Sequence, residues 1–148
     1  MLITFWEPIK LSIIVTIAAG IIVVITGTLF GLLFAKKQFK GKILVETIFM
    51  LPLVLPPSVI GFLLIVVFGN QGVIGTWIKE IFGHSIIFTS YAAVIAATVV
   101  AFPLMFQTAK AGFQGVHRKF EEAAKDLGAT NFQVFLRVSL PLAKRALL

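Results

Sequence analysis

The chain has 148 residues, of which 59% are hydrophobic and only 13% charged, and its mean hydropathy is +1.04. This balance excludes a soluble globular domain, which needs far more polar side chains to cover its surface. The formal net charge is +7, but the cations gather in two stretches and form no extended basic surface, so we expect no nucleic-acid partner.

Residues 11–35 form the first predicted membrane segment. These 25 residues carry no charge. As a helix they would be about 37 Å long, enough to cross a hydrocarbon core of about 30 Å with some tilt. A cleaved signal peptide is the alternative, but its apolar core is normally much shorter and follows a basic start instead of the mixed stretch 7–10.

Residues 43–68 form the second predicted segment, and prolines interrupt it. Each of Pro52, Pro56 and Pro57 removes a backbone donor and disturbs the preceding turn, which predicts a discontinuous helix. Broken backbone at membrane depth is tolerated where protein or a water-filled cavity satisfies the freed carbonyls. Two interpretations stay open: a break beside a transport path, with these prolines and Ser58 as pathway candidates, or a packing kink near one face.

Residues 69–85 contain a turn followed by a short amphipathic pattern. Gly69 and Gly72 favour the turn, and Ile74, Trp77 and Ile81 then recur on one face of a helix. Such a helix either lies in the membrane interface or packs against its neighbours. Residues 86–109 form the third predicted segment, which is uncharged and rich in small residues that allow close helix packing.

The distribution of cations predicts the topology. Eleven of the 13 Lys and Arg residues fall either in the loop 36–42 or in the last third of the chain. The positive-inside rule then places residues 36–42 and 110–145 in the cytoplasm and residues 69–85 and the start of the chain outside. The predicted fold is all-α, a polytopic membrane protein with three spans.

The last third has the pattern of a helical hairpin. Apolar residues recur every three to four positions over 113–128, which predicts an amphipathic helix, and Gly128 follows as a helix C-terminal glycine. Thr130 or Asn131 can cap a second helix. Asp126 lies where the helix dipole disfavours an acid, so we expect a basic neighbour or an external partner for it. From these residues alone, a solvated connector and a docking element are about equally plausible.

The stretch 122–141, EAAKDLGATNFQVFLRVSLP, resembles the EAA loop of ABC importer membrane subunits. It has Glu-Ala-Ala, three residues, Gly, nine residues, an aliphatic residue, one more, and Leu-Pro, with Val138 where the family most often has Ile. The segments LPLVLPPSVIGFLLIVVFGNQGVIG and AFPLM extend the resemblance over nearly the whole chain. It is nearest to the molybdate permease subunits, while sulfate permeases share much of the pattern.

The resemblance implies a bacterial or archaeal cell-membrane subunit that binds no cofactor, while a partner ATPase uses ATP and magnesium. Residues 113–141 would form the cytoplasmic coupling loop, and the chain would pair with a second permease copy and receive a tetrahedral oxyanion from an external binding protein. Glu122, Ala123, Ala124 and Gly128, with Asp126 and Leu127, would form the ATPase contact and the bend. Leu140 and Pro141 would turn the chain back toward the membrane.

The chain has no phosphate-binding Gly-Lys-Ser/Thr loop, so we expect it not to be the ATPase. The family continues past Leu-Pro with further helices, so we expect this chain to be a fragment or a truncated product. Two alternatives are a truncated subunit that only scaffolds the ATPase and a membrane enzyme using Glu121, Glu122 or Asp126 with His117. The chain has no cysteine, and neither His84 nor His117 has a partner at ligand spacing, so we expect no metal site.

Overall fold

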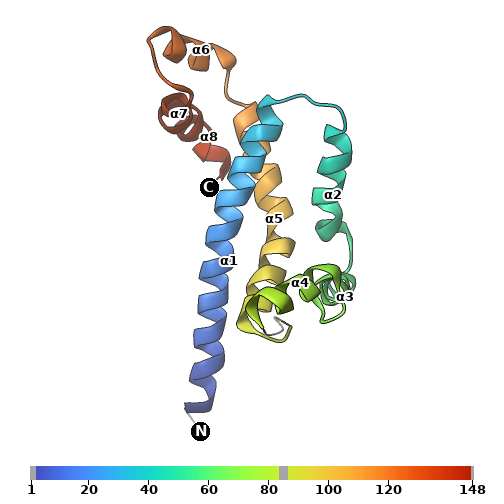
Figure 1. The fold of residues 1–148 in the computed structure, drawn as a ribbon. Helices are drawn as coiled ribbons and strands as arrows, with labels where there is room; N and C mark the ends of the chain where they lie inside the picture. Colours follow the sequence, from blue (N-terminus) through green and yellow to red (C-terminus); the bar gives the residue numbers. More distant parts are fainter. Residues whose placement is uncertain (1–2, 84–86, 148) are drawn as a thin grey trace.

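The computed structural model describes residues 3–83 and 87–147, and these form helices joined by short connections (Figure 1). His84 and the first position of the predicted third segment lie outside the described residues. The elements are α1 (Ile3–Lys36), α2 (Lys42–Val54), α3 (Pro57–Phe68), α4 (Val73–Phe82), α5 (Ser90–Gln114), α6 (Arg118–Asp126), α7 (Asn131–Val134), the π-helical turn η1 (Phe135–Ser139) and α8 (Leu140–Leu147).

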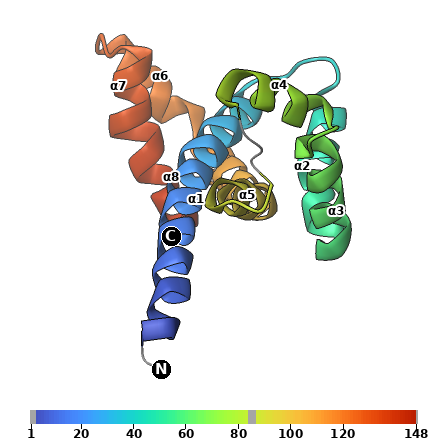
Figure 2. The ribbon, with the colours of Figure 1, turned by 60° about the horizontal axis from the view of Figure 1, so that its bottom comes forward.

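Two helices are long and apolar enough to cross a membrane, and they pack side by side and run in the same direction (Figures 1 and 2). They cover Trp6–Lys36 in α1 and Ser90–Gln114 in α5, so long apolar helices contain all or most of the predicted segments 11–35 and 86–109. Their contact is close because glycines of α1 face α5. A Cβ on Gly27 would lie 2.6 Å from Met105 Cγ, and one on Gly31 would lie 2.5 Å from Ala109 Cβ.

The second predicted segment is two helices, α2 and α3, bent by 117° at their junction. The predicted discontinuity is therefore present. It lies at Leu55 and Pro56, whose backbones are extended, and Pro57 begins α3, where a missing amide donor costs nothing. Pro52, by contrast, lies inside α2. By length and composition the bent pair fits either a broken span or a re-entrant loop.

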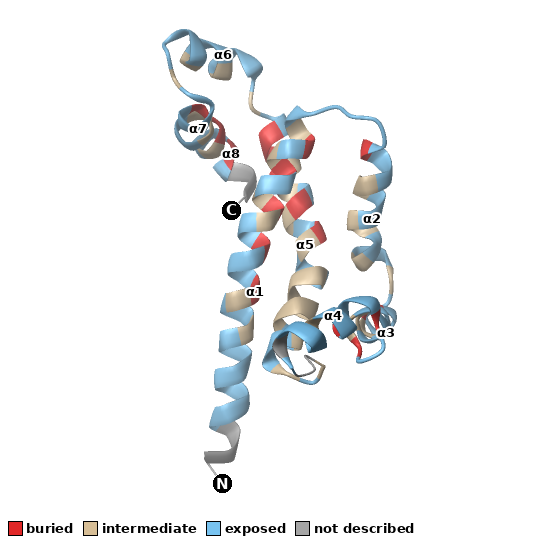
Figure 3. Ribbon diagram, viewed as in Figure 1, coloured by how far each residue is buried: buried red, intermediate tan, exposed pale blue. Residues whose placement is uncertain are grey.

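A cluster of phenylalanines holds α2 against the α1–α5 pair. Phe49 of α2 lies with its ring centroid 5.1 Å from Phe102 and 5.3 Å from Phe106, and 5.4 Å from Phe30 of α1, in edge-to-face arrangements. Edge-to-face pairs at these separations add to the burial of the rings themselves. The outer face of α2 is exposed (Figure 3). The aromatic cluster is therefore the main apolar contact between α2 and the α1–α5 pair.

An ion pair joins α2 to α5 near the aromatic cluster: Lys110 Nζ lies 2.7 Å from Glu46 Oε1, and both side chains are about one-fifth exposed. We expect Glu46→Gln to lower the free energy of unfolding by about 1 kcal/mol, because it leaves the Lys110 ammonium without its partner. The unfolding midpoint of the detergent-solubilised protein should fall by a few degrees. An unchanged midpoint would show that the pair adds nothing to the attachment of α2.

Helices α3 and α4 lie at the end of the α1–α5 pair opposite to α6 (Figure 1). The turn between them is so tight that a Cβ on Gly75 would lie 1.9 Å from the carbonyl oxygen of Gly69. The predicted short helix is confirmed as α4, and its Trp77 and Ile81 are 68% and 70% exposed. Exposed apolar residues on α4 fit a helix at the membrane interface.

Candidate functional site

The cytoplasmic hairpin of the sequence analysis is α6 followed by α7, η1 and α8, at the same end of the molecule as the loop 37–41 (Figure 1). The predicted single helix over 113–128 is wrong. Helix α5 runs on to Gln114, and α6 begins only at Arg118, after an extended His117. Phe113 therefore belongs to α5, where it is buried with Ala109 against Ala143 of α8.

The bend after α6 is built by backbone hydrogen bonds around Gly128. The amide of Ala129 donates to the carbonyl of Ala124 (3.0 Å), and the amide of Gly128 donates to that of Lys125 (2.8 Å). This pair of bonds is the Schellman motif, which needs a left-handed residue, and Gly128 has φ +87. The predicted helix-ending glycine is confirmed. The bend is thus fixed by local sequence.

The second half of the hairpin begins with a capping box. Thr130 Oγ1 accepts from the amide of Gln133 (3.3 Å), and the amide of Thr130 donates to Gln133 Oε1 (2.9 Å). Of the two predicted caps, Thr130 is the one used. Both bonds satisfy donors that the helix itself cannot pair.

Most of the residues predicted to contact an ATPase lie on the exposed side of the hairpin. Glu122, Ala123, Asp126 and Gly128 are exposed, Ala124 is partly buried, and Leu127 is 90% exposed. Within the described residues, Asp126 makes no ion pair, although Lys125 precedes it in α6. This carboxylate is left available to an external group.

Sequence reasoning missed two exposed aromatic residues beside this surface. Phe120 of α6 is 56% exposed and Phe132 of α7 is 70% exposed. Phe120 was predicted on the apolar stripe that continues from Phe113, but the break at 115–117 separates the two residues. Like Leu127, they are large apolar residues exposed on a polar hairpin, and we interpret them as candidates for contact with another protein.

Leu140 and Pro141 do not form a turn. Helix α7, η1 and α8 form one continuous helical run that carries the chain back to α5, against which α8 packs (Figures 1 and 2). Pro141 lacks the amide that would pair with the carbonyl four residues earlier, and the preceding π-helical turn has the amide of Leu140 donating to the carbonyl of Phe135. The return toward the membrane helices is therefore helical.

A partly buried polar network ties this hairpin to α1. Lys36 Nζ lies 2.6 Å from Glu121 Oε1 and donates to Ser139 Oγ (3.3 Å), which in turn donates to Glu121 Oε1 (2.5 Å). Burial raises the pKa of Glu121, but the bonds from Lys36 and Ser139 and the charges of Lys36 and Lys125 outweigh it, so this pKa lies below its ordinary value of 4.5. No local sequence signal predicts contacts across such separations along the chain.

The lowered pKa of Glu121 predicts an acid-sensitive stability. A carboxyl whose pKa is lower in the folded protein stabilises the fold above its unfolded pKa, and this contribution is lost as the pH falls through the folded value. We therefore expect the difference in unfolding midpoint between the unaltered chain and Glu121→Gln to be constant near neutral pH and to shrink below about pH 4.5. A difference that grows in acid would contradict this assignment.

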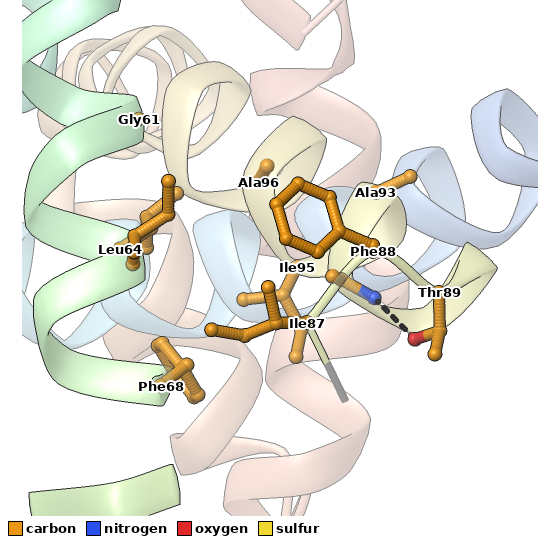
Figure 4. A pocket seen from close by; sticks show the side chains of 11 residues that line it. Gly61, Leu64, Phe68, Ile87, Phe88, Thr89, Ala93, Ile95 and Ala96 are labelled. Carbon is orange, nitrogen blue, oxygen red and sulfur yellow. Dashed lines mark hydrogen bonds between the residues drawn. The ribbon is translucent and has the colours of Figure 1, made fainter. Parts of the chain in front are cut away.

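The predicted pathway residues lie at the other end of the molecule. Pro56 and Pro57 form the α2–α3 junction, and Ser58 is exposed in the first turn of α3. Beyond them, a cavity of about 300 Å³ lies between α3 and the start of α5, and Figure 4 shows Leu64, Phe68, Phe88 and Ile95 around it. Its walls are almost wholly apolar, so the cavity does not itself solvate an oxyanion.

The described residues contain no group of three or more His, Asp or Glu side chains that could hold a metal ion. Of the residues weighed for acid–base chemistry, Glu121 is tied to Lys36 and Ser139, while Glu122 and Asp126 are exposed. Neither arrangement provides a positioned nucleophile beside a general base, and the candidate site is best described as a protein-contact surface.

Comparison with known proteins gives the family. The family model described as "Binding-protein-dependent transport system inner membrane component" matches residues 27–148. The chain belongs to this family. It is a multi-pass membrane protein, and the helices α1 and α5 and the bent pair α2–α3 agree with that assignment.

Individual relatives cover most of the chain. It is 51% identical over 144 residues to YvgM of Bacillus subtilis, a molybdenum transport system permease protein by name, covering 97% of this chain and 63% of the relative. It is 39% identical over 137 residues to the molybdenum transport system permease protein ModB of Escherichia coli, covering 93% and 60%. The molybdate/tungstate transport system permease protein WtpB of Pyrococcus abyssi is 34% identical over 138 residues, covering 93% and 50%.

The chain thus spans between half and about two thirds of the length of these relatives. The part matched by the family model, residues 27–148, includes the end of α1 and the elements from α2 to α8, and with them both candidate regions: the α2–α3 junction and the hairpin.

Proposed function

We propose that the chain is the permease subunit of an ATP-driven importer for molybdate or a similar tetrahedral oxyanion. The observation that carries this proposal is the hairpin of α6 and α7, where Glu122 and Ala123 of the EAA motif are exposed at the same end as the basic loop 37–41. The identities to relatives named for molybdenum and for molybdate/tungstate transport support the substrate class.

The hairpin is the proposed docking surface for a cytoplasmic ATPase, which binds ATP and magnesium itself. Small side chains at Ala123 and Ala124 let α6 settle into a groove, and Glu122 and Asp126 at its rim fix the register through charge. Leu127, Phe120 and Phe132 supply apolar contact area. Closure of the ATPases on ATP then moves the hairpin and alternates access between the two sides of the membrane.

The transport path is proposed to lie between this chain and a second copy, since one subunit supplies half of a two-fold path. The residues at the α2–α3 break, namely Pro52, Pro56, Pro57 and Ser58, are the candidates to line or bend it. The segments 11–35, 43–68 and 86–109 contain no Lys, Arg or His. Weak, transient contacts with the anion follow, and an external binding protein would supply selectivity.

Uptake of molybdate by proteoliposomes tests this function. The vesicles carry the assembled permease and ATPase, with the loaded binding protein added outside. We expect uptake that requires ATP and is inhibited by unlabelled molybdate or tungstate more strongly than by sulfate. An assembled complex that hydrolyses ATP without uptake would favour the scaffold alternative, and conversion of a substrate by the chain alone would favour the enzyme.

A further inference from the structure

The network of Lys36, Glu121 and Ser139 joins three elements that are far apart in the sequence. Lys36 is the last residue of α1, Glu121 lies in α6 and Ser139 ends the π-helical turn η1. Ser139 is fully buried, and the Glu121 side chain is 15% exposed. The sequence separations are 85 and 103 residues, so this contact exists only because the hairpin folds back on α1.

The rest of the interface between α6 and the membrane helices is loose. The backbone of α6 packs on α7 and η1 and makes little contact with α1 or α5. A polar cavity of about 890 Å³ lies between them, lined among others by Gln38, Gln114, Arg118 and Phe135. Within residues 3–83 and 87–147, Lys36–Glu121 is the ion pair that joins α6 to α1. Any rigid coupling of α6 to α1 therefore depends on this network.

Ser139 extends the same connection to α5. The Ser139 hydroxyl accepts a hydrogen bond from Lys36 and donates one to Glu121, so each of the three side chains contacts the other two. None of their buried polar atoms in the described chain is left unpaired. Immediately after Ser139, α8 begins and packs on α5, where Ala143 is buried against Ala109 and Phe113. The network thus lies where α6, α1 and the helical run to α5 meet.

We propose that Lys36, Glu121 and Ser139 are positioning residues that make α6 move with the cytoplasmic end of α1. This inference rests on the proposed function, because it assigns the route by which displacement of the hairpin reaches the membrane helices. A partly buried ion pair with a shared hydroxyl suits this role, because charge-assisted hydrogen bonds are short and directional. The polar cavity beside the pair has no packed side chains that could carry movement from α6 to α1.

Spin labels on α1 and α6 test the coupling directly. The chain has no cysteine, so the substitutions Leu29→Cys in α1 and Lys119→Cys in α6 introduce the only two thiols of this chain to which labels can attach. Both positions are exposed. In the assembled transporter, with labelled chains diluted into an excess of unlabelled chains so that only one of the two copies carries labels, we expect one narrow distance distribution without nucleotide and one with ATP. Glu121→Gln should broaden both distributions and lower the amount of oxyanion taken up per ATP hydrolysed about tenfold, with the ATPase still bound.

Two further variants and two controls separate coupling from general damage. Ser139→Ala removes one hydroxyl at nearly unchanged volume and should give the same change in smaller degree. The charge-reversed pair Lys36→Glu with Glu121→Lys should restore the narrow distributions and most of the uptake ratio. The controls remove one charge each at exposed positions: Lys40→Met in the loop 37–41 and Glu80→Gln on α4. Both should leave the distance distributions and the uptake per ATP unchanged.

Two results would overturn the proposal. Narrow distributions in both Glu121→Gln and Ser139→Ala would show that α6 follows α1 without the network. Broad distributions that the charge-reversed pair does not narrow would show that the substitutions loosen the hairpin in general. If the unaltered transporter takes up no oxyanion, the proposed function fails, and the distance measurements still decide whether the network holds α6 to α1.

Discussion

Gly31→Val is expected to lower the unfolding midpoint of the detergent-solubilised protein by about 10 °C, because it forces α1 and α5 apart. A Cβ at this position would lie 2.5 Å from Ala109 Cβ and 2.9 Å from the backbone nitrogen of Lys110. A backbone atom cannot move aside as a flexible side-chain end can. Overpacking of this kind costs about 3 kcal/mol, and each kcal/mol corresponds to about 2–4 °C in a chain of this size.

Gly20→Val is the matched control for Gly31→Val. Gly20 lies in the same helix, is exposed, and has nothing within 4 Å of a Cβ built on it. The same β-branched side chain is therefore added without a clash, and the midpoint should change little. If both variants lose the same stability, the cost comes from valine in α1, and the close approach of α1 to α5 at Gly31 is not the cause.

Gly128→Val is expected to reduce ATP-driven uptake by the assembled transporter to background while the chain still inserts into the membrane. Gly128 has φ +87, a conformation that a β-branched residue avoids strongly, and the two hydrogen bonds that close the bend depend on it. Without this bend, α6 and α7 cannot keep their relative directions. The membrane helices α1 and α5 do not contribute to the bend and should be unaffected.

The control for the bend is Gly128→Asn, since asparagine adopts left-handed backbone far more readily than valine. We expect Gly128→Asn to retain most of the uptake. Glu122→Lys, at an exposed position of α6, should leave the bend intact but reverse a charge on the proposed docking surface, and uptake should fall with membrane insertion unchanged. Normal uptake by Gly128→Val or Glu122→Lys with the ATPase bound would contradict the assignment of the hairpin to coupling.

The exposed apolar surface of the described chain has a simple physical cause. Residues such as Ile13, Ile17, Ile21 and Val24 are about half exposed along α1, and buried residues gather mainly where α1, α5 and α8 meet (Figure 3). Such a surface would be unstable in water, but it is the ordinary outer face of a helix whose surroundings are lipid or other membrane helices.

Several elements follow from sequence alone because their causes are local. The uncharged runs of α1 and α5 make spanning helices the stable choice in a membrane. Pro56 and Pro57 have no backbone amide to donate, and this places the break between α2 and α3. Gly128, Thr130 and Gln133 determine the bend of the hairpin through contacts within a few residues. The spaced EAA motif likewise indicates the family, which the family model confirms.

Other features had sequence signals that were weak or shared. The two glycines at 27 and 31 are spaced four apart, a known pattern of close helix contact, and they could have predicted where α1 meets α5. The apolar periodicity over 113–128 misled, because Phe113 and Phe120 keep helical spacing although the backbone is extended between them at His117. Periodicity reports which residues are apolar, and it does not report whether one helix carries them all.

What the sequence determined by itself is therefore the long apolar helices, the break between α2 and α3, the bend and the family. Only the tertiary structure decided which face of each helix is covered, that Phe113 belongs to the core of α5 and α8, and that Glu121 is held by Lys36 and Ser139 while its neighbour Glu122 stays exposed. The physical reason is range. Caps, prolines and hydropathy act within a few residues, whereas an ion pair between positions 36 and 121 forms only after the helices have packed and brought the end of α1 close to α6.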